Sequence, residues 1–305
     1  MRKFIIILVF IFLTACNVNE NLQTKTIDTE EKIVVYTTIY PLEYILNYLL
    51  GDKGDVATIL PSGSDAHNYE PTQKQLIDIY ESNMFVYLGL GLEAAAVDIN
   101  LAMDGSKTKS LEVGKYLDME NINKDAHGDH SHGNHHIWID PMNMIYMGEV
   151  VKDSIIETFP QLEENVTMNF KNFETDMKNL DKEYTNRLNT SLKRDTFIVS
   201  HDAFAHYEKY NIFSLPVKDE SHSKDPTQKE MEKLIEEGKA KDIKTVFYEA
   251  NIPCLPLDVI KDELNAKKET LDNLSIRTEI EVENNADYIE KSIRNIEVLE
   301  KALNE

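Results

Sequence analysis

The chain of 305 residues has little cysteine, few basic side chains and no long apolar run. Its 32 Lys and Arg residues are outnumbered by 54 Asp and Glu residues, which gives a formal net charge of -22. Nucleic-acid binding needs a basic surface, so this composition excludes it. The apolar run at 4–13 has ten residues, whereas a helix that spans a bilayer needs about 20. An acidic surface raises the local cation concentration, although a solvated surface without any ligand explains the composition equally well.

Two signatures of hydrolytic enzymes are also absent from the sequence. There is no His-Glu-x-x-His zinc motif and no Gly-x-Ser-x-Gly nucleophile elbow. The sequence therefore predicts a protein that is not an enzyme. A zinc hydrolase is the alternative, and it would need an open metal position for water and a general base nearby.

The N-terminal segment has the pattern of a lipoprotein signal. Two basic residues, an apolar run and small residues before Cys16 follow one another in the order of an export signal. The sequence Leu-Thr-Ala-Cys at 13–16 resembles a bacterial lipobox, whose cysteine is diacylated and becomes the mature N-terminus. Two acyl chains anchor a protein stably. The resemblance implies a bacterial, extracytoplasmic, membrane-anchored protein with a signal peptide at 1–15 and a flexible tether at 16–31; an ordinary cleaved signal is the alternative.

Only two cysteines, Cys16 and Cys254, are present. A lipidated Cys16 leaves Cys254 without a disulfide partner, so packing must stabilise the fold. We expect Cys254 to be a small buried apolar residue, and a contact with a metal is the alternative.

Short apolar strands alternate with helical segments in both halves of the chain. The expected strands lie at 32–38, 56–60, 84–90, 196–200, 244–248 and 268–271. The expected helices are 41–50, one that begins at Thr72, and a last one at about 286–303. This alternation is typical of βαβ units with a parallel sheet. Two similar fragments, Pro-Thr-Gln-Lys-Gln-Leu at 71–76 and Pro-Thr-Gln-Lys-Glu-Met at 226–231, indicate two similarly built lobes.

One long amphipathic stretch separates the two halves. Apolar residues recur there at steps of three or four, with no Gly or Pro between them: Leu162, Val166, Phe170, Phe173, Met177, Leu180, Tyr184, Leu188 and Leu192. A rigid helix that crosses both lobes explains this position, and a coiled coil is the alternative. The predicted fold class is α/β, with two lobes of parallel sheet flanked by helices and joined by one long rigid helix. The predicted domains are 32–160 (with a His-rich loop at 125–136), 161–193 and 194–305.

Three histidines lie in distinctive motifs. His67 follows an expected strand and its turn, in Ser-Asp-Ala-His-Asn-Tyr-Glu-Pro, and His201 directly follows another, in Ser-His-Asp-Ala-Phe. His136 begins the segment His-Ile-Trp-Ile-Asp-Pro. Ligands bind at the carboxyl ends of strands in open α/β sheets. Because imidazole nitrogen suits zinc, nickel or copper, these positions predict a metal site.

Together the three motifs resemble the metal-binding solute receptors of ABC importers, the zinc and manganese group called cluster A-I. The resemblance covers essentially the whole mature chain. It implies two α/β lobes joined by a long helix, with metal ligands at His67, His136 and His201. Many members carry Leu-Asp-Pro-Leu near the C-terminus, where the aspartate is a ligand. This chain has Leu-Asp-Asn-Leu at 271–274, so the resemblance makes Asp272 the fourth candidate.

The resemblance also implies a metal and partners. Manganese-type relatives tend to carry a glutamate at the position of His201, whereas three imidazoles and one carboxylate favour zinc. We therefore expect a monomeric zinc receptor that delivers the ion, as its transported ligand, to an ABC permease in the membrane. A receptor for manganese or another transition metal in the same family is one alternative, and a surface adhesin is another.

A His-rich run precedes the second motif. Five of the ten residues at 127–136 are histidine, a composition that indicates metal binding. The run resembles the flexible His-rich loop of zinc-type receptors, which makes His127, His130, His132 and His135 accessory ligands; a solvated loop without a role is the alternative. His135 could exchange with His136, and the spacing to the following tryptophan favours His136.

Four other residues are minor candidates. His206 could be an accessory ligand, and Glu249, at the end of an expected strand, could accept a hydrogen bond from a ligating histidine. We expect His222 on a surface loop and Trp138 in the apolar core.

Overall fold

The structure is a computed structural model that describes residues 32–122, 134–188, 192–219, 224–250, 253–284 and 286–305. The predicted signal peptide and tether lie outside these residues. Residues 32–305 form one compact unit. Within the described ranges, no helix is both long enough and apolar enough to cross a membrane.

The N-terminal lobe contains a four-stranded parallel sheet. Its strands, in the order β2-β1-β3-β4, are β1 (Ile33–Thr37), β2 (Gly54–Thr58), β3 (Met84–Tyr87) and β4 (Lys109–Glu112). The connecting helices are α1 (Tyr40–Leu50), α2 (Gln73–Glu81), α3 (Ala96–Ala102) and α4 (Met119–Ile122), with short 3-10 turns at Gly51–Lys53 and Val113–Tyr116. All four residues of β3 are buried, as expected for a strand covered on both faces.

The C-terminal lobe repeats this plan. Its parallel strands, in the order β6-β5-β7-β8, are β5 (Thr196–His201), β6 (Phe213–Lys218), β7 (Thr245–Glu249) and β8 (Lys267–Leu271). The connecting segments are a 3-10 helix at Ala205–Tyr210, α7 (Gln228–Ala240) and α8 (Leu255–Leu264), and α9 (Glu279–Glu283) follows the sheet. In both sheets the strand that comes second along the chain lies at one edge, and the strand that comes first lies between the second and the third. The prediction of two parallel-sheet lobes is confirmed.

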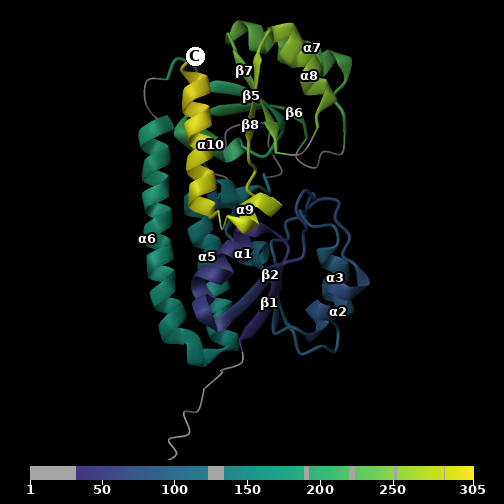
Figure 1. Ribbon diagram of the computed structural model, residues 1–305, viewed down its shortest axis with the longest axis vertical. Helices are drawn as coiled ribbons and strands as arrows, with labels where there is room; N and C mark the ends of the chain where they lie inside the picture. Colours follow the sequence, from purple (N-terminus) through teal and green to yellow (C-terminus); the bar gives the residue numbers. More distant parts are fainter. Residues whose placement is uncertain (1–31, 123–133, 189–191, 220–223, 251–252, 285) are drawn as a thin grey trace, which may run out of the picture. The chain divides into compact units, whose positions relative to one another are not determined.

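Long helices link the lobes. These are α5 (Pro141–Thr158), α6 (Glu163–Leu188), which follows a 3-10 turn at Pro160–Leu162, and α10 (Tyr288–Leu303). The 26 residues of α6 extend about 39 Å at 1.5 Å per residue. Its buried stripe packs on α1, α5 and α10, and Figure 1 shows α6 (teal) beside α10 (yellow). The long linking helix is therefore confirmed, and its apolar stripe is covered from within the chain.

One apolar core is continuous through these linking helices. It contains Val35 and Phe85 from the first sheet, Phe173 and Tyr184 from α6, and Phe247 from the second sheet. A smaller cluster, which includes Ile198, Val246 and Leu257, lies where α7 and α8 cover the second sheet. The lobes thus share a packed interior, and this interior fixes the strand ends that carry the candidate ligands.

Candidate metal centre

His67 lies in the loop that follows β2. The loop turns at Gly63, whose φ of +79° favours glycine. The carboxylate of Asp65 then accepts a hydrogen bond from the backbone N–H of His67 at 3.0 Å. This local turn, of a kind that Asp forms readily, holds His67 at the carboxyl end of the first sheet.

His136 stands directly before a 3-10 turn at Ile137–Ile139 and the start of α5. The carboxylate of Asp140 caps α5 by accepting from the backbone N–H of Met142 at 2.8 Å, and Pro141 occupies the first turn, where proline is tolerated. Trp138 is fully buried, as expected, and its indole N–H donates to the carbonyl of Asn273 at 2.7 Å. The segment around His136 is therefore tied to the loop after β8.

His201 is the last residue of β5 and is 0 % exposed. Its Nδ1 lies 2.7 Å from Oε2 of Glu249, the last residue of the neighbouring strand β7. Glu249 was expected to lie beside a ligating histidine, and the structure places its carboxylate in contact with His201. Since a carboxylate can only accept, the proton of the His201 ring belongs on Nδ1.

The structure brings His67, His136 and His201 together. Each ring offers one nitrogen, and these nitrogens all lie within 4.8 Å of one another. Nε2 of His136 and Nε2 of His201 are 3.3 Å apart. In a tetrahedral zinc site with bonds of 2.0–2.1 Å, neighbouring donors lie about 3.3–3.4 Å apart. The spacing of these two nitrogens therefore fits a shared ion of that size.

Burial also keeps the ring of His136 uncharged. His136 is 2 % exposed, and this burial holds the pKa of its ring well below the ordinary value for histidine; the neighbouring His201 and His67 add to the effect. A neutral imidazole has a lone pair for a metal, whereas an imidazolium has none. The site is thus built for binding a cation through nitrogen.

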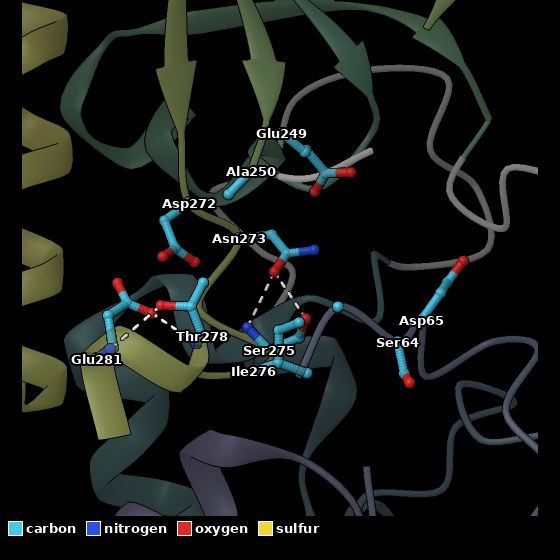
Figure 2. A pocket seen from close by; sticks show the side chains of 11 residues that line it. Ser64, Asp65, Glu249, Ala250, Asp272, Asn273, Ser275, Ile276, Thr278 and Glu281 are labelled. Atoms are coloured by element: carbon cyan, nitrogen blue, oxygen red, sulfur yellow. Dashed lines mark hydrogen bonds between the residues drawn. The ribbon is translucent and has the colours of Figure 1, made fainter. Parts of the chain in front are cut away.

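Asp272 lies close by but is not among the three grouped ligands. With Glu249 and Asp65 it lines a small pocket, where Figure 2 shows Glu249 and Asp272 at the ends of neighbouring strands. Its carboxylate pairs with Lys291 at 2.8 Å and accepts from the backbone N–H of Leu274 at 2.7 Å. Burial raises the pKa of Asp272, and Lys291 opposes that rise. Metal ligation by Asp272 stays a prediction.

The remaining candidates have mixed outcomes. His206 is buried in the 3-10 helix after β5, and its Nε2 lies 3.5 Å from the carbonyl of Asn134. Cys254 is buried, as expected, and is not part of the histidine group. His135 is half-buried beside His136. Cys16, His222 and the accessory histidines His127, His130 and His132 lie outside the described residues.

Sequence reasoning missed Asn134. Its side chain is buried and contacts both the His136 segment and the end of β5. The only signal in the sequence was an amide side chain two residues before a candidate ligand, in a position that permits a local turn.

Comparison with known proteins gives consistent results. The family model described as "Zinc-uptake complex component A periplasmic" matches residues 35–302. The high-affinity zinc uptake system protein ZnuA of Bacillus subtilis is 25 % identical over 309 residues, covering 98 % of this chain and 96 % of ZnuA. The zinc-binding protein AdcA of Streptococcus pyogenes is 26 % identical and covers 91 % of this chain, which spans 57 % of AdcA. The chain thus spans little more than half the length of these AdcA relatives.

Solved structures share the fold. The laminin-binding protein Lbp of Streptococcus pyogenes has a TM-score of 0.77 at 25 % identity, with 89 % of this chain and 99 % of Lbp covered. The Zn(II)-bound ZnuA-like domain of Streptococcus pneumoniae AdcA has a TM-score of 0.74 at 22 % identity, with 90 % of this chain and 100 % of that domain covered.

Proposed function

Because the chain belongs to the zinc-uptake component A family, we propose that it is an extracytoplasmic, high-affinity zinc receptor that supplies an ABC import permease. The observation that carries the proposal is the 3.3 Å separation of Nε2 in His136 and Nε2 in His201, with His67 beside them. Three imidazoles from two lobes form a site that suits zinc.

The contact of Glu249 with His201 supports this proposal. A carboxylate at this distance favours a ring proton on Nδ1, which leaves the lone pair on Nε2, 3.3 Å from Nε2 of His136. Carboxylate partners of this kind orient metal-binding histidines and increase their basicity. A positive ion between the rings would be stabilised by the buried negative charge behind them.

The choice of zinc over manganese rests on the donor types. Manganese favours oxygen donors, yet the grouped donors are all nitrogen. A manganese receptor of the same family is the alternative. We propose Asp272 as the fourth donor, which would complete a closed site without an open position for water. Such a site serves capture and transport, and the family is a transport component, so we propose no catalytic activity.

Several proposals concern the residues around the site. We propose lipidation of Cys16 after removal of 1–15, a tether at 16–31, lobes at 32–160 and 194–305, and a linking helix at 161–193. The protein would be a monomer that docks on its permease. The accessory histidines would gather zinc weakly before transfer. The similar protein Lbp is named for laminin binding, and an adhesin role for this chain is the second candidate.

Metal content and competitive zinc titration of the purified protein test the proposal. Wild type should bind one equivalent of zinc tightly. In His201→Ala the zinc affinity should fall more than about 100-fold. Loss of a residue that only hydrogen-bonds a metal ligand lowers affinity by about 10–100-fold, and loss of a ligand itself should lower it further. His135→Ala, one residue from a proposed ligand, should keep the tight equivalent and lose only weaker binding. Preference for manganese, or tight zinc binding by His201→Ala, would refute the assignment.

A further inference from the structure

Asn134 joins the two lobes directly behind the histidine cluster. Its side chain is 3 % exposed. Its Oδ1 lies 2.8 Å from the backbone N of His136 and 3.2 Å from Nδ1 of the same residue. Its Nδ2 donates to the carbonyl of Asp202 at 2.6 Å. Both ends of this amide therefore contact residues that carry or adjoin a proposed ligand.

The contacts fix which end of the amide is which. The carbonyl of Asp202 can only accept, so the NH2 group of Asn134 must face it. The oxygen of the amide then faces His136, where the backbone N–H donates to it. Reversing the amide would set oxygen against the carbonyl and NH2 against a backbone N–H, which leaves two buried repulsive contacts.

We infer that Asn134 is a positioning residue of the proposed zinc site, which holds His136 in the tautomer with its proton on Nδ1. An amide oxygen has no hydrogen, so a hydrogen bond with Nδ1 of His136 requires the ring to donate. The lone pair is then on Nε2, 3.3 Å from Nε2 of His201. This inference rests on the proposed function.

The alternative tautomer shows why such control matters. With its proton on Nε2, His136 could donate directly to Nε2 of His201 across the 3.3 Å between them. The two histidines would then satisfy each other, and an incoming ion would have to break that bond. Glu249 keeps the proton of His201 on Nδ1, and Asn134 does the same for His136. Together they leave two lone pairs facing one point, which favours a cation.

The amide also sets the distance between the rings. Asn134 lies in the segment before α5, two residues before His136. Asp202 directly follows His201 at the end of β5. The hydrogen bond to Asp202 therefore holds the backbone beside one proposed ligand against the backbone beside the other. A purely local turn would need only the contact with the backbone N–H of His136.

Two variants separate the two contacts. Asn134→Asp keeps an oxygen facing His136 and loses the donor to Asp202, whereas Asn134→Ala loses both. Nitrogen NMR of the histidine rings in the metal-free full-length protein reports the tautomer, and competitive titration with zinc reports affinity. Wild type and Asn134→Asp should show His136 protonated on Nδ1. Asn134→Ala should show a substantial Nε2-protonated population and bind zinc about 10–100-fold more weakly.

The outcomes distinguish this inference from the proposed function. An Nε2-protonated His136 in wild type would overturn the inference, as would an Asn134→Ala variant that keeps both the Nδ1 tautomer and wild-type affinity. If Asn134→Ala fails to fold, the ring spectra of wild type and Asn134→Asp still decide. Failure of the proposed function would give a different result: His136→Ala would bind zinc as tightly as wild type.

Discussion

At the scale of single residues, the buried ammonium of Lys291 controls the carboxylate of Asp272. Lys291 is 1 % exposed and lies 2.8 Å from Asp272, 2.9 Å from Glu281 and 2.9 Å from the carbonyl of Ile276. A buried ammonium needs such partners, since leaving it unpaired is costly. A metal that recruited Asp272 would therefore share this carboxylate with Lys291, while Glu281 kept the lysine paired.

Asp272→Asn tests whether this carboxylate reaches the metal. We expect zinc affinity to fall at least tenfold, because an amide oxygen is a much weaker donor than a carboxylate. Competitive titration measures the change. Glu290→Gln is the matched control, since it neutralises an exposed carboxylate at the start of α10 and should leave zinc affinity as in wild type. Equal zinc affinity in wild type and Asp272→Asn would remove Asp272 from the site.

The candidate site was predictable from the sequence only in part. His67, His136 and His201 stand in local motifs that identify them before any fold is known. The residues that contact the candidate ligands come from distant parts of the chain and could not be predicted. Lys291, which pairs with Asp272, lies 19 residues further along on the last helix, and no local pattern links the two. Asn134 meets Asp202 across 68 residues, so its role is visible only in the structure.

At the scale of elements, the two similar fragments of the sequence prove to be matching helix starts. The hydroxyl of Thr72 accepts from the backbone N–H of Gln75, and the side chain of Gln75 accepts from the backbone N–H of Thr72. Thr227 and Glu230 make the same pair of contacts. Each capping box satisfies two backbone donors at a helix N-terminus.

Removing either cap should lower stability by a similar amount. Thr72→Ala and Thr227→Ala should each reduce the free energy of unfolding by about 1 kcal/mol, because one helix donor loses its partner. Urea denaturation of the metal-free protein measures this change. Thr175→Ala, at an exposed position on α6, should stay within about 0.5 kcal/mol of wild type. A cap variant as stable as wild type would contradict the expectation.

Two strands were not predicted from the sequence. The strand β4 reads Lys-Ser-Leu-Glu, which has too few apolar residues to stand out. The strand β6 contains Pro216, and proline usually indicates a turn. Both are edge strands. The outer edge of such a strand has no neighbouring strand to hydrogen-bond with, so polar residues and proline are tolerated there. The central strands were predictable because burial on both faces requires apolar runs.

At the scale of the whole described unit, the lobes are braced against each other. The ammonium of Lys209, after β5, pairs with Asp140 at the start of α5 and with Asp181 on α6. The same helices enclose the continuous apolar core. Wide hinge closure would break these contacts, so we expect only small lobe movements.

Small-angle X-ray scattering with and without zinc measures that movement. The radius of gyration should be the same within error for the two states, because α6 and the shared core hold the lobes at one separation. Lys209→Met, which removes the brace, is the informative comparison: it should allow a larger change on zinc addition. A clear contraction of wild type with zinc would show a hinge and contradict the prediction.

The positions of the three histidines along the chain have a further consequence. His67 and His136 are 69 residues apart, and His136 and His201 are 65 apart. An ion held by all three would close two long loops, and it would restrict the unfolded chain much as two disulfides do. Within the described part of the chain, Cys254 is a free thiol. Zinc would thus act as a removable cross-link, and delivery of the cargo would leave behind a protein that unfolds and is proteolysed more readily.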